Sequence, residues 1–138
     1  LFVLGGLYLP RFDVFYGPKV KEALEGVHVD ILFLGIDGIS LEHGLTTDNV
    51  LEADLYQNLI ACATRVVVVA DSSKIGINQL QAILTLDQIH TLITDSGAPK
   101  DFVSTLRDRG IEVFIANKSQ HSNREDAPCS FARSRLGL

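Results

Sequence analysis

The 138-residue sequence predicts an α/β fold, a Rossmann-like three-layer parallel sheet with flanking helices. Three observations support this class. Short apolar runs rich in β-branched residues alternate with segments of helical spacing. The runs are almost continuously apolar, which is typical of strands that are covered on both faces. The composition, 46% hydrophobic and 21% charged, is that of an ordinary globular domain and excludes a disordered, collagenous or coiled-coil chain.

The strands are expected at four places along the chain. β-branched residues dominate each run, and turn-forming residues follow it. The four expected strands are residues 30–34, 65–70, 91–94 and 112–116. Residues 1–4 have the composition of a fifth strand.

The helices are expected between these strands. The strongest candidate is the segment 49–64, in which apolar residues recur at helical spacing and Thr47 or Asp48 precedes the first turn as N-cap. Proline favours the first turn of a helix and glycine favours the position just past its end. Proline opens the expected helices 18–26 and 99–109 and glycine follows their last turns, and the segment 76–84 completes the set.

Residues 1–116 are expected to form one domain, and residues 117–138 form a mostly irregular tail because they lack hydrophobic periodicity. The formal net charge is −5, from 12 Lys and Arg against 17 Asp and Glu, so the chain has no basic field with which to hold a nucleic-acid duplex. No apolar run approaches the ~20 residues that a membrane helix needs.

The cysteines and the first residues of the sequence indicate a cytoplasmic protein. The two cysteines, Cys62 and Cys129, are far apart and have no metal-ligand or disulfide spacing, which suits a reducing cytosol. The chain begins inside an apolar run without an initiator Met, so we expect a fragment of a longer cytoplasmic protein.

Three expected strands end in an aspartate followed by a small residue, at Asp37, Asp71 and Asp95. The carboxyl ends of parallel strands share one edge of a sheet, where ligands bind, so one crevice would collect all three carboxylates. The alternative is that each aspartate caps the turn or helix that follows it. Because the pattern recurs at three strand ends, it favours a ligand site for the three aspartates together more than a ligand-binding role for any single one.

Further candidates lie in the neighbouring loops. Lys74 follows Asp71 by three residues among small residues and can meet a phosphate or carboxylate there, although a solvated surface lysine is the simpler interpretation. Thr46 and Asn49 offer a hydroxyl and an amide to a polyol just before the long helix, where an ordinary helix start is the alternative. Glu52 lies in the first turn, where the helix dipole favours a carboxylate.

Several familiar signatures are absent from the sequence. There is no GxGxxG or P-loop, no GxSxG elbow, and no metal-ligand spacing among the four histidines. No cofactor or metal is therefore expected.

The order of four motifs resembles the C-terminal effector domain of DeoR-family bacterial transcriptional regulators. The motifs are Phe-Leu-Gly-Ile-Asp-Gly-Ile at 33–39, Gly-Leu-Thr-Thr at 44–47 with Glu-Ala at 52–53, Val-Val-Ala-Asp-Ser-Ser-Lys-Ile-Gly at 68–76, and Ile-Thr-Asp at 93–95. The resemblance implies a sugar-phosphate sensor with the fold of ribose-5-phosphate isomerase and CoA transferases. It also implies operator binding through an N-terminal helix-turn-helix that this chain lacks, and a homo-dimer or homo-tetramer.

The resemblance assigns roles to the candidate residues. Asp37 and Glu52 would accept hydrogen bonds from sugar hydroxyls, Thr46 and Asn49 would orient the sugar, and Lys74 would face the anionic end. The full expected ligand-binding set is Asp37, Gly38, Thr46, Asn49, Glu52, Asp71, Lys74 and Asp95. Residues 1–116 would then be the effector-sensing domain of a repressor. The upstream strand and Gly/Ser/Thr-rich phosphate loop of such sensors have no counterpart in this sequence.

The enzymes that share the fold supply the competing function, a sugar-phosphate isomerase or deaminase. In the register of the isomerases, the catalytic carboxylate on the long helix falls on Tyr56, and a phenol with a pKa near 10 is a poor general base at neutral pH. Glu52, one turn away, is the remaining candidate for a base. A pure dimerisation module with a degenerate pocket is the third possibility.

Overall fold

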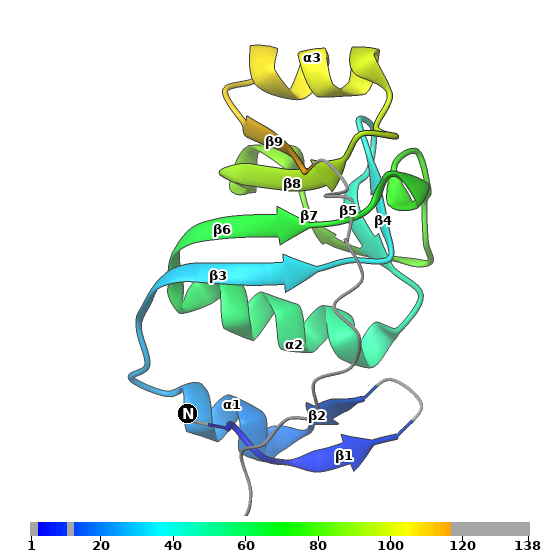
Figure 1. The fold of residues 1–138 in the computed structure, drawn as a ribbon. Helices are drawn as coiled ribbons and strands as arrows, with labels where there is room; N and C mark the ends of the chain where they lie inside the picture. Colours follow the sequence, from blue (N-terminus) through cyan, green and yellow to red (C-terminus); the bar gives the residue numbers. More distant parts are fainter. Residues whose placement is uncertain (1–2, 11–12, 117–138) are drawn as a thin grey trace, which may run out of the picture.

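Four parallel strands form the central sheet of the computed structural model, which describes residues 3–10 and 13–116 (Figure 1). The strands are β3 (Val29–Gly35), β6 (Ala63–Val69), β8 (Thr91–Asp95) and β9 (Glu112–Ala116). Their order in the sheet is β3-β6-β8-β9, and all three pairings are parallel. The four expected strands are thus confirmed to within two residues at each end, and the class is a mixed α/β fold. Val3 and Leu4 form no strand, and residues 1–2 of the expected fifth strand lie outside the described residues.

The described residues form three α-helices, and two of these connect strands of the central sheet. These are α1 (Pro18–Leu24), α2 (Val50–Ala61) and α3 (Lys100–Asp108). Pro18 opens α1 as expected, whereas Pro99 is the N-cap of α3 rather than its first residue. Gly26 and Gly110 follow the helix ends with φ of 74° and 83°, in the left-handed region that glycine tolerates. None of the described helices is long and apolar enough to cross a membrane.

A second, antiparallel sheet packs beside the first, and it contains the main error of the sequence prediction. Its strands are β4 (Gly38–Ser40), β5 (Gly44–Thr47) and β7 (Gln81–Leu84), in the order β4-β5-β7. The expected helix at 76–84 is wrong, because Leu84 and Gln81 pair with β5 and bury this segment as a strand. Short 3-10 turns, η1 (Ser72–Lys74) and η2 (Leu86–Gln88), flank β7.

A hairpin precedes the central sheet. Strands β1 (Leu7–Leu9) and β2 (Val14–Tyr16) pair antiparallel, and together with α1 they lie beyond α2, on the side away from the sheet (Figure 1). The sequence pattern gave no sign of this hairpin.

The hydrophobic core lies between one face of the parallel sheet and the elements that connect its strands. Sheet residues such as Val68 and Leu92 are fully buried there. They join Ile83 of β7 and Phe102 and Leu106 of α3 in a single apolar cluster, with Tyr56 and Ile60 of α2 packed against it. The expected apolar stripe of the long helix is only partly right, because its first residues, Val50 and Leu51, are exposed.

Candidate functional site

The carboxyl ends of three adjacent strands meet at one edge of the parallel sheet, as the sequence predicted. Asp37 follows β3, Asp71 follows β6 and Asp95 is the last residue of β8. These strands are neighbours in the sheet order, so the three aspartates lie along the same edge. Their contacts differ: Asp71 and Asp95 bind neighbouring loops, whereas Asp37 contacts a buried hydroxyl.

Asp71 and Asp95 hold the loops of this edge together. The Oδ1 atom of Asp71 accepts a hydrogen bond of 2.8 Å from the backbone N–H of Ser73 and caps η1. Its hydrogen bonds with Ser73 lower the pKa of the Asp71 carboxyl. Asp95 accepts hydrogen bonds from the backbone N–H of Ser72 at 2.7 Å, from the Ser72 hydroxyl at 2.9 Å and from the backbone N–H of Gly97 at 2.7 Å. Both carboxylates are therefore engaged in loop structure.

Asp37 instead belongs to a cluster with Thr47 and Glu52. The Thr47 hydroxyl is fully buried and lies 2.7 Å from Asp37 Oδ2 and 3.3 Å from Glu52 Oε2. It also accepts a hydrogen bond of 3.2 Å from the backbone N–H of Asn49. A hydroxyl carries one proton, so Thr47 can donate fully to only one of the two carboxylates. The cluster brings together the β3–β4 turn, the end of β5 and the first turn of α2.

Burial and mutual repulsion set the protonation of this cluster. Glu52 is only 9% exposed, and burial, followed by the negative charge of Asp37, raises the pKa of its carboxyl above the usual value. Tyr56, one helical turn along α2, lies against Glu52. Burial and the negative charges of Glu52 and Asp37 raise the pKa of Tyr56 to about 12. Its phenol therefore stays protonated at neutral pH and can donate a hydrogen bond to the carboxyl of Glu52.

Asn49 both starts α2 and adds a donor to the cluster. It is the N-cap residue, and its Oδ1 accepts a hydrogen bond of 3.1 Å from the backbone N–H of Leu51. The expectation of Thr47 or Asp48 as N-cap is wrong by one or two residues. The amide Nδ2 of Asn49 lies near the Glu52 carboxyl, but it is buried without a hydrogen-bond partner among the described residues. A buried donor of this kind costs stability unless an acceptor reaches it.

Gly38 and Thr46 are packed against each other beside the cluster. Thr46 is 2% exposed, and its hydroxyl accepts a hydrogen bond of 3.0 Å from the backbone N–H of Gln79. A Cβ atom at Gly38 would lie 2.8 Å from the Thr46 hydroxyl and 2.5 Å from the carbonyl oxygen of Ile77. Glycine is therefore required here by close packing of the β3–β4 turn against the segment before β7.

Lys74 lies in the loop that packs beside the same turn. The backbone N–H of Gly76 donates to the carbonyl of Ile39 at 2.8 Å, and Ile75 forms a parallel bridge with Ile39. These contacts hold η1 next to β4, which begins directly after Asp37. Lys74 is half-buried as a residue, and its ammonium makes no ion pair within residues 3–10 and 13–116. It lies close enough to Asp71 to help lower the pKa of that carboxyl.

Thr47 and Tyr56 are the members of the site that sequence reasoning missed in these roles. Thr47 was expected to be a helix cap or to offer a hydroxyl to a polyol, and Tyr56 was considered as a poor base at the catalytic position of the isomerases. A signal was present for Tyr56, which lies four residues after Glu52 and therefore on the same face of the helix. The sequence alone gave no sign that Thr47 also reaches Asp37, ten residues earlier.

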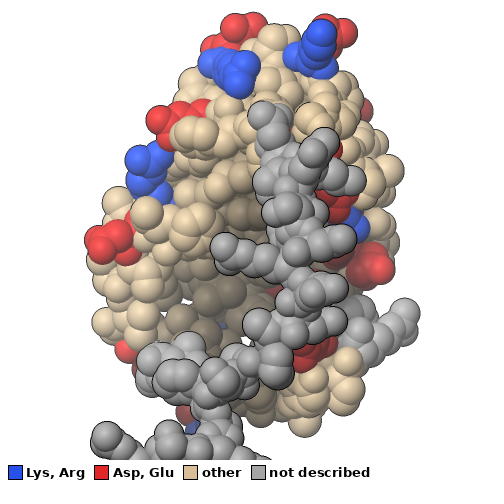
Figure 2. Space-filling model, in the orientation of Figure 1, with Lys and Arg blue, Asp and Glu red and all other residues tan. Residues whose placement is uncertain are grey.

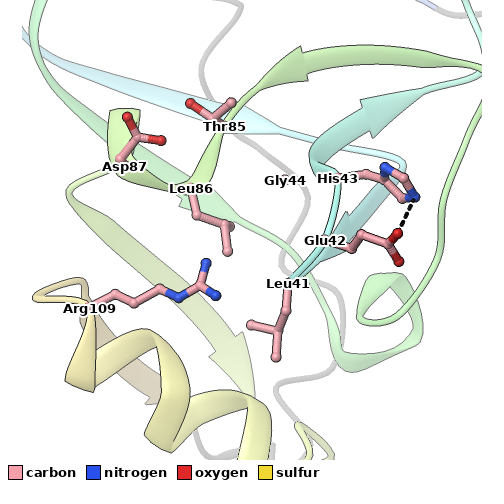
Figure 3. A pocket seen from close by; sticks show the side chains of 8 residues that line it. All are labelled: Leu41, Glu42, His43, Gly44, Thr85, Leu86, Asp87 and Arg109. Atoms are coloured by element: carbon pink, nitrogen blue, oxygen red, sulfur yellow. Dashed lines mark ion pairs between the residues drawn. The ribbon is translucent and has the colours of Figure 1, made fainter.

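A separate pocket lies away from this cluster (Figure 3). It has a volume of about 390 Å³, and none of the expected site residues lines it. Its walls come from the β4–β5 turn, η2 and the end of α3, and the side chains of Leu41, Leu86 and Arg109 point toward its centre (Figure 3). The pocket is also lined by the acidic residues Glu42 and Asp87, by the basic residue Arg109 and by His43.

The cluster, together with the neighbouring Asn49 and Lys74, has chemical groups that can bind a polar organic ligand. Carboxyl groups accept hydrogen bonds from hydroxyls, the amide of Asn49 donates one, and the ammonium of Lys74 attracts an anion. In the part of the chain that the structure describes, no three His, Cys, Asp or Glu side chains form a group that could hold a metal ion.

Comparison with known proteins gives the family. Residues 1–96 match the family model described as the DeoR C terminal sensor domain. The match covers more than half of the chain, and the chain therefore belongs to this family of transcriptional-regulator sensor domains. The resemblance inferred from the motifs is confirmed.

The relatives are transcriptional regulators of bacteria and archaea. The chain is 37% identical over 118 residues to a protein of Escherichia coli O157:H7 whose name assigns it to repression of the aga operon; the match covers 86% of this chain and 44% of that protein. It is 33% identical over 109 residues to the HTH-type transcriptional regulator GlpR of Haloferax volcanii, covering 79% and 43%. It is 31% identical over 120 residues to the HTH-type transcriptional repressor GlcR of Bacillus subtilis, covering 87% and 46%. The chain thus spans a little under half the length of these relatives.

Proposed function

We propose that this chain is the effector-binding and oligomerising domain of a DeoR-family repressor, and that its effector is a phosphorylated sugar. The observation that carries the proposal is the cluster of Asp37, Thr47 and Glu52, with the Lys74 loop beside it. The Asn49 amide lies next to the Glu52 carboxyl, and its Nδ2 has no hydrogen-bond partner by distance among the described residues. Sugar hydroxyls would bind the two carboxyl groups, a sugar oxygen would accept from Asn49, and the phosphate would lie toward Lys74.

Asp71, Asp95, Thr46 and Gly38 enter this proposal as positioning residues. Their hydrogen bonds and close contacts fix the loops that present Lys74 and Asp37. Effector binding would then act by shifting the population between DNA-competent and incompetent states, which requires different affinities for the two. Specificity for one sugar rests on which hydroxyls meet Asp37 and Glu52.

Operator DNA would be held by another part of the full-length regulator. Residues 1–116 carry 15 acidic and 8 basic residues, a net charge of −7. In the face shown in Figure 2, Lys and Arg side chains lie apart among Asp and Glu and do not gather into a basic patch. Such a surface repels phosphates, so a helix-turn-helix module outside this chain is the proposed DNA contact.

Calorimetric titration tests the proposal. The full-length regulator is titrated with a panel of sugar phosphates, with the corresponding free sugars and inorganic phosphate as controls. We expect one or a few sugar phosphates to bind more tightly than either control, because both halves of the site contribute. Absence of binding across the panel, or equal binding of the free sugars, would contradict a phosphorylated effector.

One observation favours the competing enzyme function, namely the raised pKa of Glu52, since general acids and bases are commonly tuned in this way. Against it, the expected catalytic position is Tyr56, whose phenol with a pKa of about 12 does not act as a base at neutral pH. A coupled assay for aldose–ketose conversion separates the two. Turnover that disappears in Glu52→Gln would establish the enzyme, whereas binding without turnover supports the sensor.

A further inference from the structure

The pocket at the β4–β5 turn lies at the opposite end of the second sheet from the Asp37 cluster. Strand β5 runs from Gly44, which lines the pocket, to Thr47, which belongs to the cluster. Strand β7 pairs antiparallel with β5 and ends at Leu84, directly before Thr85 of the pocket. The pocket is therefore a separate place in the fold, roughly 10 Å from the cluster at the usual rise of a strand.

Two leucine side chains form the apolar part of the pocket. Leu86 is 5% exposed and belongs to the hydrophobic core, so packing fixes its position. Leu41, in the β4–β5 turn, is 39% exposed. Both side chains point toward the centre of the pocket from different elements (Figure 3). The volume of about 390 Å³ lies within the range of pockets that bind small organic molecules, roughly 300–1,000 Å³.

Arg109 places a guanidinium without a partner in the same pocket. Arg109 is the C-cap residue of α3, and its side chain points toward the centre of the pocket (Figure 3). Within residues 3–10 and 13–116, the guanidinium makes no hydrogen bond and no ion pair. A guanidinium has five N–H donors in a planar fork, which suits it to bind a carboxylate through two parallel hydrogen bonds.

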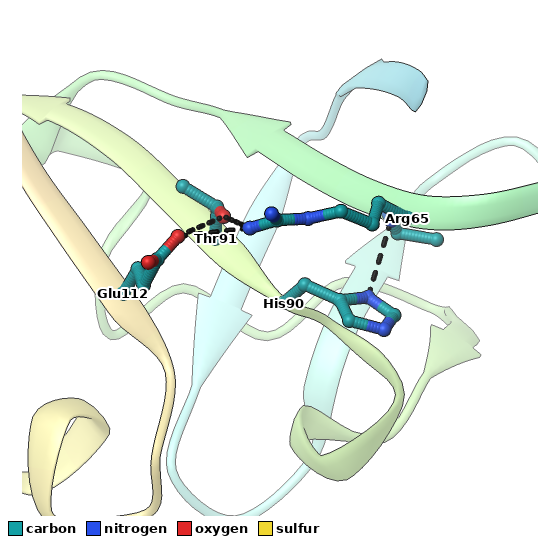
Figure 4. Close-up of polar contacts among 5 residues, drawn as sticks. Arg65, His90, Thr91 and Glu112 are labelled. Atoms are coloured by element: carbon teal, nitrogen blue, oxygen red, sulfur yellow. Dashed lines mark hydrogen bonds and ion pairs between the residues drawn. The ribbon is translucent and has the colours of Figure 1, made fainter. Parts of the chain in front are cut away.

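Two other arginines at the amino end of the parallel sheet have protein partners. Arg65 Nη2 lies 2.9 Å from Glu112 Oε2, so this pair of charges is neutralised (Figure 4). Arg107 Nη2 donates a hydrogen bond of 3.0 Å to the carbonyl oxygen of Val113. Of these three arginines, Arg109 is therefore the one that can bind a ligand without first losing a protein contact.

Two carboxylates line the pocket together with Arg109 but do not pair with it. Neither Glu42 nor Asp87 forms an ion pair with the guanidinium. Hydrogen bonding from Thr85 lowers the pKa of the Asp87 carboxyl, which is therefore ionised at neutral pH. Glu42 lies 3.7 Å from the imidazole of His43. The carboxylates would repel a purely anionic ligand and Arg109 would repel a purely cationic one, so the pocket favours a ligand that carries both charges.

We propose that this pocket is a second small-molecule site of the domain, and that its ligand is a zwitterion of the amino-acid type with an apolar side chain. The ligand carboxylate binds the guanidinium of Arg109, and the ligand ammonium binds the carboxylate of Asp87. The apolar side chain packs against Leu41 and Leu86. Hydrogen bonds between charged groups, as in both polar contacts, are stronger than neutral ones. None of the residues that line the pocket belongs to the expected effector-binding set, so the proposal is independent of the sugar-phosphate site.

A titration of the 138-residue chain with L-phenylalanine, followed by nuclear magnetic resonance, tests the proposal on the unmodified protein. Phenylpropanoate lacks the ammonium group and phenethylamine lacks the carboxylate, so each analogue removes one charge and keeps the ring. We expect L-phenylalanine to shift the backbone amide signals of Leu41, His43 and Asp87 and to leave that of Glu52 unchanged. It should bind roughly tenfold more tightly than either analogue, because each analogue loses a hydrogen bond between charged groups.

Two variants with matched controls test the charges of the pocket. Arg109→Ala and Asp87→Asn change exposed side chains, and each should weaken the binding of L-phenylalanine roughly tenfold. The controls Lys100→Ala and Asp101→Asn change exposed residues at the other end of α3 and should leave binding unchanged.

Each other result overturns the proposal. An analogue that binds as tightly as L-phenylalanine would show that the pocket recognises a single charge. Amide shifts confined to residues outside the pocket, or no shifts at all, would show that the pocket does not bind such a zwitterion. Equal losses in the pocket variants and their controls would show a general effect of charge. Because no sugar phosphate is present, none of these outcomes bears on the proposed effector.

Discussion

The ionised carboxylate of Glu52 lowers the stability of the domain. Its carboxyl is buried beside a second carboxylate, and the one hydroxyl between them cannot satisfy both. The folded state therefore favours the protonated carboxyl, which is what a pKa raised above the unfolded value expresses. This contribution to stability is complete below pH 4.5 and is lost as the pH rises through the higher folded-state pKa.

Glu52→Gln should remove that pH dependence. The glutamine amide is uncharged at every pH, so we expect the variant to gain stability relative to the wild type as the pH rises from 4 to 7. Urea denaturation at several pH values measures the difference, with the exposed Glu25→Gln as the control that stays parallel to the wild type. A constant difference between Glu52→Gln and wild type over this range would show that Glu52 titrates alike in the folded and unfolded states.

Lys74 carries the second residue-scale prediction. If its ammonium meets the phosphate, Lys74→Ala should weaken effector binding by about 1.5–3 kcal/mol, the usual worth of a hydrogen bond to a charged group, or roughly 10- to 150-fold in Kd. Unfolding free energy should change by less than about 0.5 kcal/mol, because the side chain makes no ion pair in the described residues.

Calorimetry with the best sugar phosphate of the panel measures the loss, and the exposed Lys100→Ala controls for the change in overall charge. The prediction is contradicted if Lys74→Ala lowers the unfolding free energy of the domain while the folded molecules bind the effector with unchanged affinity. Lys74 would then be a structural partner of the loop, and the anionic end of the effector would bind elsewhere.

At the scale of single elements, the β4–β5 turn depends on Gly44. Its φ of +67° lies in the left-handed region, and a Cβ atom there would collide with the carbonyl oxygen of Leu84 at the end of β7. Gly44→Ala should therefore lower the unfolding free energy by roughly 2–4 kcal/mol, from backbone strain and forced separation of β5 from β7.

The matched control is Gly35→Ala in the 138-residue chain. Gly35 ends β3 with ordinary backbone angles, and no atom lies within 4 Å of a Cβ built there. We expect its unfolding free energy to stay within about 0.5 kcal/mol of the wild type. Equal effects of the two substitutions in chemical denaturation would show that the β4–β5 turn relaxes without cost.

The elements that the sequence predicted well are those whose local signals agree with their surroundings. In β6, residues 66–69 form an unbroken apolar run, which is typical of parallel strands, and Pro18 marks a helix start by its fixed φ. Residues 76–84 were predicted to be a helix because the strand within them, β7, has only four residues. So short a strand shows no clear alternation of apolar and polar residues. The conformation of this segment is decided by pairing with β5, some 35 residues earlier in the chain, which no local window contains.

The site shows the same division. Asp37, Asp71 and Asp95 were placed correctly at one sheet edge, because strand ends can be counted from the sequence. Their separate roles were not predictable, since a hydrogen bond such as that between Ser72 and Asp95 depends on which loops meet across neighbouring strands. The coupling of Thr47 to both acids likewise arises only when β5 packs beside the β3–β4 turn.

At the scale of the whole molecule, the charge distribution bears on assembly. Residues 1–116 are strongly acidic and therefore repel DNA, which leaves their surface available for contacts between subunits. Operators with repeated half-sites are matched by symmetric oligomers, and two-fold symmetric dimers and their tetramers are the commonest solutions. These two points together favour the sensor domain as the part that holds the subunits together.

We therefore expect the 138-residue chain to form dimers or tetramers by itself at micromolar concentration, measured by light scattering coupled to size-exclusion chromatography. The oligomer should persist at 0.5 M salt. An interface between two acidic domains must be mainly apolar to offset the repulsion between them. Salt screens the surface charges at that ionic strength and therefore weakens such an interface little. A chain that remains monomeric under these conditions would place oligomerisation in another part of the regulator.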